Sequence, residues 1–173
     1  YISTIEFYKA QIEVIESYAI LKNRKKNIPK LILIGPEYKP YAKLVRKSII
    51  KNQLQNDILL KRAIPNRDLP ALYQNAKINI FASMTENCPL IFLEALASGR
   101  PLVASNCQPM PEFGLHYVEY FNPSQPDELA NLIEKILNNK DLSDRLSKKA
   151  LERSKDFDWS LSAKKTWSAI KSL

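Results

Sequence analysis

The chain has 173 residues, of which 45% are hydrophobic and 25% charged, and its 26 Lys and Arg against 18 Asp and Glu give a formal charge of +8. This length can bury a sizeable core, so we expect one α/β domain over residues 1–173 and exclude collagen-like and low-complexity proteins. One His and two Cys exclude histidine-rich metal sites, serine–histidine triads and a disulfide framework, which fits a reducing cytosol.

Short apolar runs alternate with longer segments of helical periodicity along most of the chain, which is typical of a parallel α/β sheet. In chain order we expect strand 1–5, helix 9–23, strand 31–34, helix 41–51, strand 58–60, helix 67–75, strand 78–82, helix 89–98, and strands 102–104 and 118–121. Several strands lack alternation of apolar and polar residues, as strands buried on both faces do. The order predicts a Rossmann-like, doubly wound parallel sheet that binds ligands at the carboxyl ends of its strands.

Only helices are expected after residue 121. Apolar residues recur at helical spacing between residues 129 and 137, a basic helix should cover 142–154, and a last helix should run from residue 160 to the C-terminus. Trp159 and Trp167 are interpreted as core or domain-docking residues. No run of eighteen apolar residues occurs, so we expect a soluble segment.

The positive charge fits nucleic acid, an anionic membrane surface or a phosphate-bearing small ligand. Lys39, Lys43, Lys47 and Lys51 recur every four residues and would form one stripe on a helix. Tyr41 is the only aromatic residue between these lysines in the sequence, and no nucleic-acid-binding module is recognised, so nucleic acid is not expected as a partner. A solvated helix face is the favoured interpretation, and peripheral contact with a membrane stays open as the alternative.

The loop after strand 78–82 is the strongest candidate for a site. Pro89 suits a first helical turn, so the amides of Leu90 and Ile91 should point out of the helix end, where an anion would bind. Glu94 is a lone carboxylate in an apolar helix, and if buried it needs hydrogen-bond donors, which two sugar hydroxyls would supply. Glu86, eight residues earlier, could face the same crevice. The alternative is that Glu94 pairs with a lysine and Glu86 is merely exposed.

Residues 86–99 resemble the Glu, seven residues, Glu motif of family 4 glycosyltransferases, with the Ala, apolar, Ala, Ser, Gly sequence that follows it. Similar segments of that family are recognised at residues 1–9, 31–35, 68–76, 99–105, 111–112 and 157–160. The resemblance therefore covers essentially the whole chain. It implies the C-terminal half of a GT-B fold, which binds the nucleotide-sugar donor, and it places the N-terminal acceptor domain outside this chain.

The resemblance also implies roles for individual residues. Glu94 would hold the ribose hydroxyls, Glu86 the hydroxyls of the transferred sugar, and Lys9 the diphosphate, with Glu86 and Lys9 as the catalytic residues. The donor-binding set would comprise Glu94, Asn87, Cys88, Leu90, Ile91, Gly35, Arg62, Ala63 and Ile64. The implied reaction is a retaining transfer from a UDP- or GDP-linked sugar to a saccharide or lipid-linked acceptor in the cytoplasm, with neither a metal nor another cofactor.

Four positions depart from the family pattern. Thr4 stands where an arginine is usual, so one of two expected phosphate cations is missing, and Asn87 and Pro89 replace the usual glycines. Arg62 replaces a glycine beside the base, which leaves the identity of the base open. Two other functions remain as alternatives: a GT-B epimerase acting on a UDP-sugar, and a non-catalytic interaction or membrane-docking module with the same fold.

Overall fold

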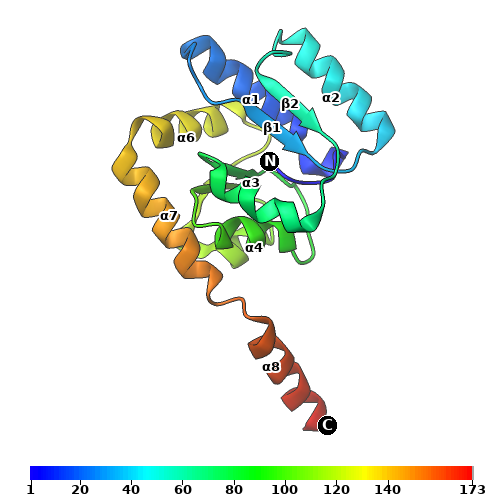
Figure 1. Cartoon of the computed structure of the whole chain (residues 1–173), viewed down its shortest axis with the longest axis vertical. Helices are drawn as coiled ribbons and strands as arrows, with labels where there is room; N and C mark the ends of the chain where they lie inside the picture. Colours follow the sequence, from blue (N-terminus) through cyan, green and yellow to red (C-terminus); the bar gives the residue numbers. More distant parts are fainter. Residues whose placement is uncertain (173) are drawn as a thin grey trace.

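Parallel strands with helices on both sides make up the body of the chain, and one helix projects from it (Figure 1). The computed structural model describes residues 1–172. The α-helices are α1 (Gln11–Arg24), α2 (Lys39–Lys51), α3 (Leu69–Asn75), α4 (Leu90–Ala97), α5 (Met110–Gly114), α6 (Pro126–Asn138), α7 (Lys140–Ser154) and α8 (Trp159–Lys171). The strands are β1 (Leu31–Ile34), β2 (Ile58–Lys61), β3 (Asn79–Phe81), β4 (Leu102–Ser105) and β5 (Glu119–Phe121).

The five strands form two parallel sheets, with the order β1-β2 in one and β3-β4-β5 in the other. Neighbouring residues of a strand belong to different cores: Ile80 packs in the core under α1 and α6, whereas Phe81 packs in the core under α4. Val103 and Ala104 of β4 divide in the same way. Strands β3 and β4 are therefore buried on both faces, which confirms the predicted doubly wound, Rossmann-like α/β fold.

The first five residues are the main departure from the predicted sheet. Residues 1–5 form no regular strand and pair with the β1 edge only through two isolated parallel bridges, Ile2 with Ile34 and Ile5 with Glu37. Gly35 makes this close approach possible, because a Cβ on it would lie 2.0 Å from the Ser3 carbonyl oxygen. A central strand needs a ladder on each side, whereas this segment forms only two isolated bridges, both on its β1 side.

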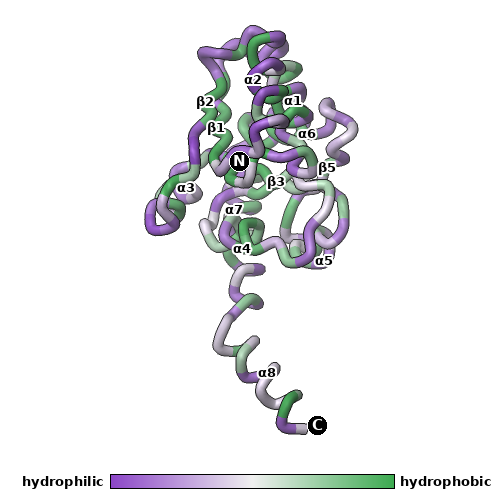
Figure 2. The backbone as a smooth tube through the Cα atoms, turned by 90° about the vertical axis from the view of Figure 1, so that its right-hand side faces the viewer, coloured by the Kyte–Doolittle hydropathy of each residue, from purple (hydrophilic) through white to green (hydrophobic). Residues whose placement is uncertain are grey.

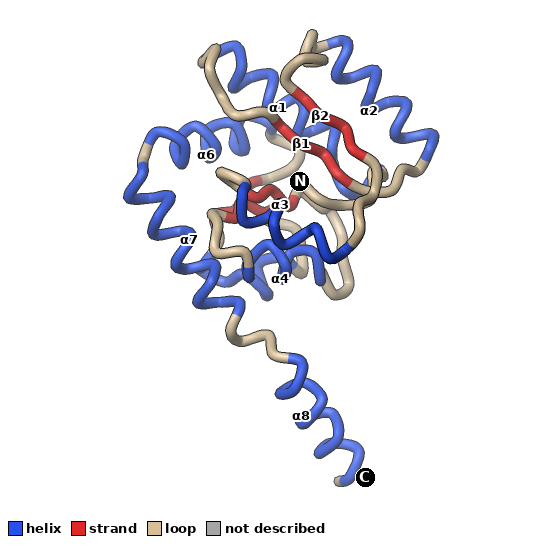
Figure 3. The backbone as a smooth tube through the Cα atoms, viewed as in Figure 1, coloured by secondary structure: helices blue, strands red, loops and turns tan. Residues whose placement is uncertain are grey.

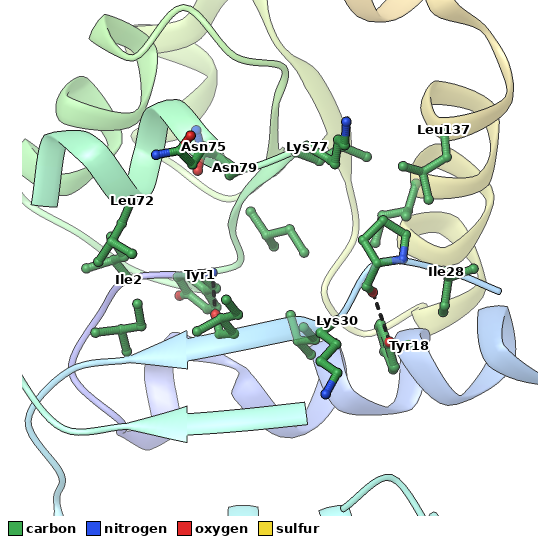
Figure 4. A pocket seen from close by; sticks show the side chains of 18 of the residues that line it. Tyr1, Ile2, Tyr18, Ile28, Lys30, Leu72, Asn75, Lys77, Asn79 and Leu137 are labelled. Carbon is green, nitrogen blue, oxygen red and sulfur yellow. Dashed lines mark hydrogen bonds between the residues drawn. The ribbon is translucent and has the colours of Figure 1, made fainter. Parts of the chain in front are cut away.

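A cavity of about 270 Å³ lies between the two sheets, next to Tyr1 (Figure 4). Its wall is mostly apolar and comes from α1, β1, α3, β3 and α6. The main-chain nitrogen of Tyr1 donates a hydrogen bond to the Ile32 carbonyl oxygen at 2.8 Å.

Several helix boundaries differ from the sequence prediction. Lys9 lies in a short 3-10 turn, Phe7–Lys9, and α1 begins only at Gln11 because Ala10 between them has a left-handed backbone with φ of 54°. Helix α2 begins at Lys39, two residues earlier than predicted. Helix α5 was not predicted, since a helix of five residues carries no periodic pattern.

Helix α8 stands clear of the body (Figures 1 and 3). Trp159 is 77% exposed and Trp167 59% exposed, so neither is a core residue of this chain, as one of the two interpretations had held. The tube in Figure 2 shows hydrophobic positions along α8 that no other element covers. Phe157, just before α8, stacks on Phe113 with ring centroids 5.7 Å apart. The prediction for residue 173 lies outside the described residues.

Candidate functional site

Lys9 and Glu86 form a salt bridge at the carboxyl edge of the sheet. Lys9 ends the turn that follows residues 1–5, and Glu86 lies in the loop that follows β3. Their side chains are only 7% and 14% exposed, and the Lys9 ammonium also lies 4.8 Å from the centroid of the Tyr8 ring. The fold therefore joins two of the predicted site residues across 77 positions of sequence. It also corrects the alternative in which Glu86 was merely exposed and Glu94 took the lysine.

Main-chain contacts hold this pair in place. The Met84 amide donates to the Tyr8 carbonyl oxygen at 2.7 Å, so the loop after β3 is tied to the turn that carries Lys9. The Tyr1 hydroxyl donates to the Lys9 carbonyl oxygen at 2.8 Å. The Ser105 hydroxyl donates to the Ser83 carbonyl oxygen at 2.5 Å and links the same loop to the end of β4. Both charged side chains are thus carried by backbone that is fixed from several sides.

The start of α4 differs from the prediction in one respect. Pro89 is the residue before the first turn, with φ of −81° and ψ of 72°, and the Leu90 amide donates to the Cys88 carbonyl oxygen at 2.9 Å. The predicted free amide of Leu90 is therefore engaged within the chain. Among the described residues, no backbone acceptor is found for the Ile91 amide, which stays in the position expected of an anion-binding helix end.

Glu94 is exposed, so the condition under which it would need hydrogen-bond donors, burial in an apolar helix, is not met. Helix α4 buries Phe92, Ala95 and Leu96, whereas Leu90 and Glu94, four residues apart, lie on its exposed face. The Glu94 carboxylate accepts a hydrogen bond from the Tyr73 hydroxyl, with 3.1 Å between Oη and Oε2. A carboxylate that is exposed and held at one oxygen can accept hydrogen bonds from a ligand.

The other predicted residues divide into two groups. Asn87 and Cys88 are exposed in the loop before α4, and Arg62 and Ala63 are exposed directly after β2, with Ile64 half-buried. Because these loops follow parallel strands, they lie at the same edge of the fold as Lys9 and Glu86. Gly35 is instead buried against the backbone of residues 3 and 4, so its glycine is explained by packing within the chain.

Sequence reasoning missed the part that Tyr73 plays in the site. It was interpreted as a packing residue of a helix, and its ring is indeed buried, but its hydroxyl reaches a site carboxylate 21 residues away. The one signal in the sequence is general: a buried tyrosine hydroxyl needs a hydrogen-bond partner. Nothing in the sequence names that partner.

Two features are absent from the residues that the structure describes. Within residues 1–172, no group of three or more His, Cys, Asp and Glu side chains is placed to hold a metal ion. None of the helices in the same range combines the length and apolar character that a membrane span requires.

The sequence model of the family described as "Glycosyl transferases group 1" matches residues 1–153. The chain is 26% identical over 174 residues to an O-antigen chain mannosyltransferase B of Escherichia coli, a match that covers 100% of this chain and 45% of that protein. The chain thus spans about half the length of this curated relative.

Solved structures show the same fold. HepE of Anabaena, in complex with UDP, superposes with a TM-score of 0.88 at 21% identity over 99% of this chain and 48% of that one. The C-terminal domain of a glycosyl transferase group 1 family protein, LpcC of Francisella tularensis, superposes with a TM-score of 0.79 at 18% identity over 90% of this chain and 83% of that one. The LpcC domain is nearly the same length as this chain.

Proposed function

The chain belongs to the glycosyl transferases group 1 family, and on that premise we propose that it is the donor-binding half of a retaining hexosyltransferase. The donor is a nucleoside-diphosphate sugar and the acceptor a saccharide or lipid-linked saccharide. The observation that carries the proposal is the buried Lys9–Glu86 pair beside the exposed Glu94, all at the carboxyl edge of a doubly wound sheet. This edge is where such sheets bind ligands.

The chemistry follows from what these groups can do. When the bond between the sugar and the diphosphate breaks, negative charge grows on the leaving diphosphate, and a fixed cation stabilises that charge more than it stabilises the bound donor. Lys9 supplies the cation and the free amide of Ile91 a second donor. No step of this proposal requires a metal ion.

The carboxylates bind the neutral parts of the donor. Glu94 is exposed and accepts hydrogen bonds from the ribose hydroxyls, whereas Glu86, already held by Lys9, accepts from hydroxyls of the transferred sugar. Diphosphate binding gives the Lys9 ammonium a second anionic partner. We therefore expect donor binding to loosen the Lys9–Glu86 pair and free one Glu86 oxygen for the sugar.

The class of donor is supported by the relatives. HepE of Anabaena was solved with UDP and with UDP-glucose, and the Escherichia coli relative is named as a mannosyltransferase. These names share a hexosyl group and differ in the hexose. We propose a cytoplasmic reaction in polysaccharide or glycolipid synthesis, with the acceptor bound by a further, facing domain, since the relatives are about twice as long as this chain.

Titration calorimetry of the chain with UDP, GDP and their hexose conjugates tests the proposal. We expect saturable binding to one nucleoside diphosphate at submillimolar to millimolar concentration and weaker binding of the matching monophosphate, because the monophosphate lacks the group that Lys9 contacts. Inorganic pyrophosphate and free hexoses serve as controls for the two ends of the donor. If neither UDP nor GDP binds saturably at millimolar concentration, the proposal is wrong.

A membrane-docking role is a second candidate, favoured by α8. Trp159 and Trp167 are exposed on a helix that also carries Lys164, Lys165 and Lys171, a composition suited to an anionic lipid surface. Sedimentation with vesicles of phosphatidylcholine and phosphatidylglycerol tests it. Binding that requires the anionic lipid and is lost in Trp167→Ala supports the role, and the absence of cosedimentation contradicts it.

A further inference from the structure

The Tyr73 hydroxyl of α3 donates a hydrogen bond to the Glu94 carboxylate, and this bond fixes one oxygen of an otherwise exposed group. From this geometry we infer that Tyr73 is a positioning residue, which orients Glu94 for the two vicinal hydroxyls of a ribose. The inference rests on the proposed function, because it concerns the carboxylate that would bind the ribose.

Tyr73 is itself held rigidly. Its side chain is 5% exposed and belongs to the same core as Phe81 and Phe92. The Asn79 side-chain amide donates both to the Tyr73 carbonyl oxygen at 3.4 Å and to the Ser98 hydroxyl at 3.0 Å. These bonds tie the end of α3 to the start of β3 and the end of α4. The Tyr73 hydroxyl is therefore a fixed donor and not a mobile surface group.

The chemistry of the pair leaves Glu94 capacity for a ligand. A carboxylate has about four lone-pair positions, and Tyr73 occupies one of them on Oε2. Oε1 and the second position on Oε2 remain for two hydroxyl donors on neighbouring carbons. Burial and the nearby negative charge of Glu94 both raise the pKa of the Tyr73 hydroxyl, so it stays protonated and continues to donate.

A purely structural role would give a different result. If the bond served only to satisfy a buried tyrosine hydroxyl, its loss would change stability and affect every ligand alike. If the bond orients Glu94, its loss should weaken only those ligands that carry the vicinal hydroxyls. The discrimination between a ribonucleoside diphosphate and its 2′,3′-dideoxy counterpart therefore separates the two roles.

The test compares Tyr73→Phe with the unmodified chain by calorimetry, using UDP, GDP and their 2′,3′-dideoxy counterparts. Tyr73→Phe keeps the buried ring and removes one hydroxyl, so we expect the Kd of the ribonucleotide that binds to rise about fivefold, as for loss of one net hydrogen bond. The Kd of its dideoxy counterpart should stay within about twofold. Equal weakening of both ligands, or of neither, would overturn the inference.

Tyr18→Phe is the matched control. Tyr18 is also 5% exposed, and its hydroxyl donates to the Pro29 carbonyl oxygen at 2.9 Å, but it lies in the other core. The same chemical change is thus made at the same burial without touching Glu94. We expect both Kd values to be unchanged in this variant, and a comparable loss of discrimination would contradict a specific role for Tyr73.

Glu94→Asp examines the pair from its other side. The shorter side chain keeps the charge but withdraws the carboxylate from Tyr73, so it should lose the same discrimination, and adding Tyr73→Phe should cost no further affinity. Additive losses would overturn the inference. If the unmodified chain binds UDP and GDP no better than their dideoxy counterparts, the ribose assignment to Glu94 fails, which is a failure of the proposed function and not of the positioning step alone.

Discussion

The cavity between β1 and β3 and the rim that carries Lys9, Glu86 and Glu94 are opposite in chemistry. The cavity has a volume of about 270 Å³ and a mostly apolar wall, and none of its lining residues belongs to the predicted site. The rim holds the largely buried Lys9–Glu86 ion pair and the exposed Glu94 carboxylate, one oxygen of which accepts a hydrogen bond from Tyr73. The apolar cavity reflects a gap in the packing between the two sheets, whereas polar groups with remaining hydrogen-bond capacity mark where a ligand binds.

The largest expected effect on donor affinity is that of Glu94→Ala, at the rim. Two charge-assisted hydrogen bonds to ribose hydroxyls contribute about 3 kcal/mol together, so the Kd of the nucleoside diphosphate should rise about a hundredfold or more. Calorimetry measures this, with Glu152→Ala, an exposed glutamate of α7, as the control that keeps its affinity. An unchanged Kd in Glu94→Ala would remove Glu94 from the site.

The next largest effect on donor affinity is expected for Lys9→Met, which removes the cation but keeps most of the side-chain volume. The diphosphate loses one charge-assisted contact, so the Kd should rise about tenfold, and the partly buried Glu86 loses its partner, so the free energy of unfolding should fall by about 1–3 kcal/mol. Lys22→Met is a matched control, since Lys22 pairs with Asp57 at 2.6 Å outside the site. Equal losses of affinity in both variants would show that Lys9 acts through stability alone.

The sequence predicts different features of the two regions. Strands β1 to β5 are predicted from local apolar runs, because a few consecutive apolar residues are enough to indicate a buried strand. Residues 1–5 are apolar enough to resemble a strand, but among the described residues no strand pairs with them on the β3 side. Such pairing depends on distant parts of the chain, which local patterns do not describe. The cavity was accordingly not foreseen.

At the rim, residue types are predictable and their partners are not. The motif singles out Glu86 and Glu94, but the apolar neighbours of Glu94 in sequence left open whether it is buried, and the helix places it away from the face that buries Phe92 and Ala95. The pairing of Lys9 with Glu86 spans 77 residues and that of Tyr73 with Glu94 spans 21. Such pairings are set by the fold, and no spacing rule reveals them.

The smallest expected effect tests whether the rim binds through built contacts or through the net charge of +8. Lys47 and Lys51 are exposed in the second half of α2, away from its start at the sheet edge. At physiological salt, exposed charges are screened over about 8 Å, so the double variant Lys47→Glu/Lys51→Glu should change the Kd of the nucleoside diphosphate by less than about twofold. Calorimetry at 0.05 M and 0.15 M salt measures it. If the double variant loses more affinity than this and the loss disappears at the higher salt concentration, the diphosphate is attracted by the field of the whole chain. The contrast between the rim and the rest of the molecule would then depend on Glu94 and not on Lys9.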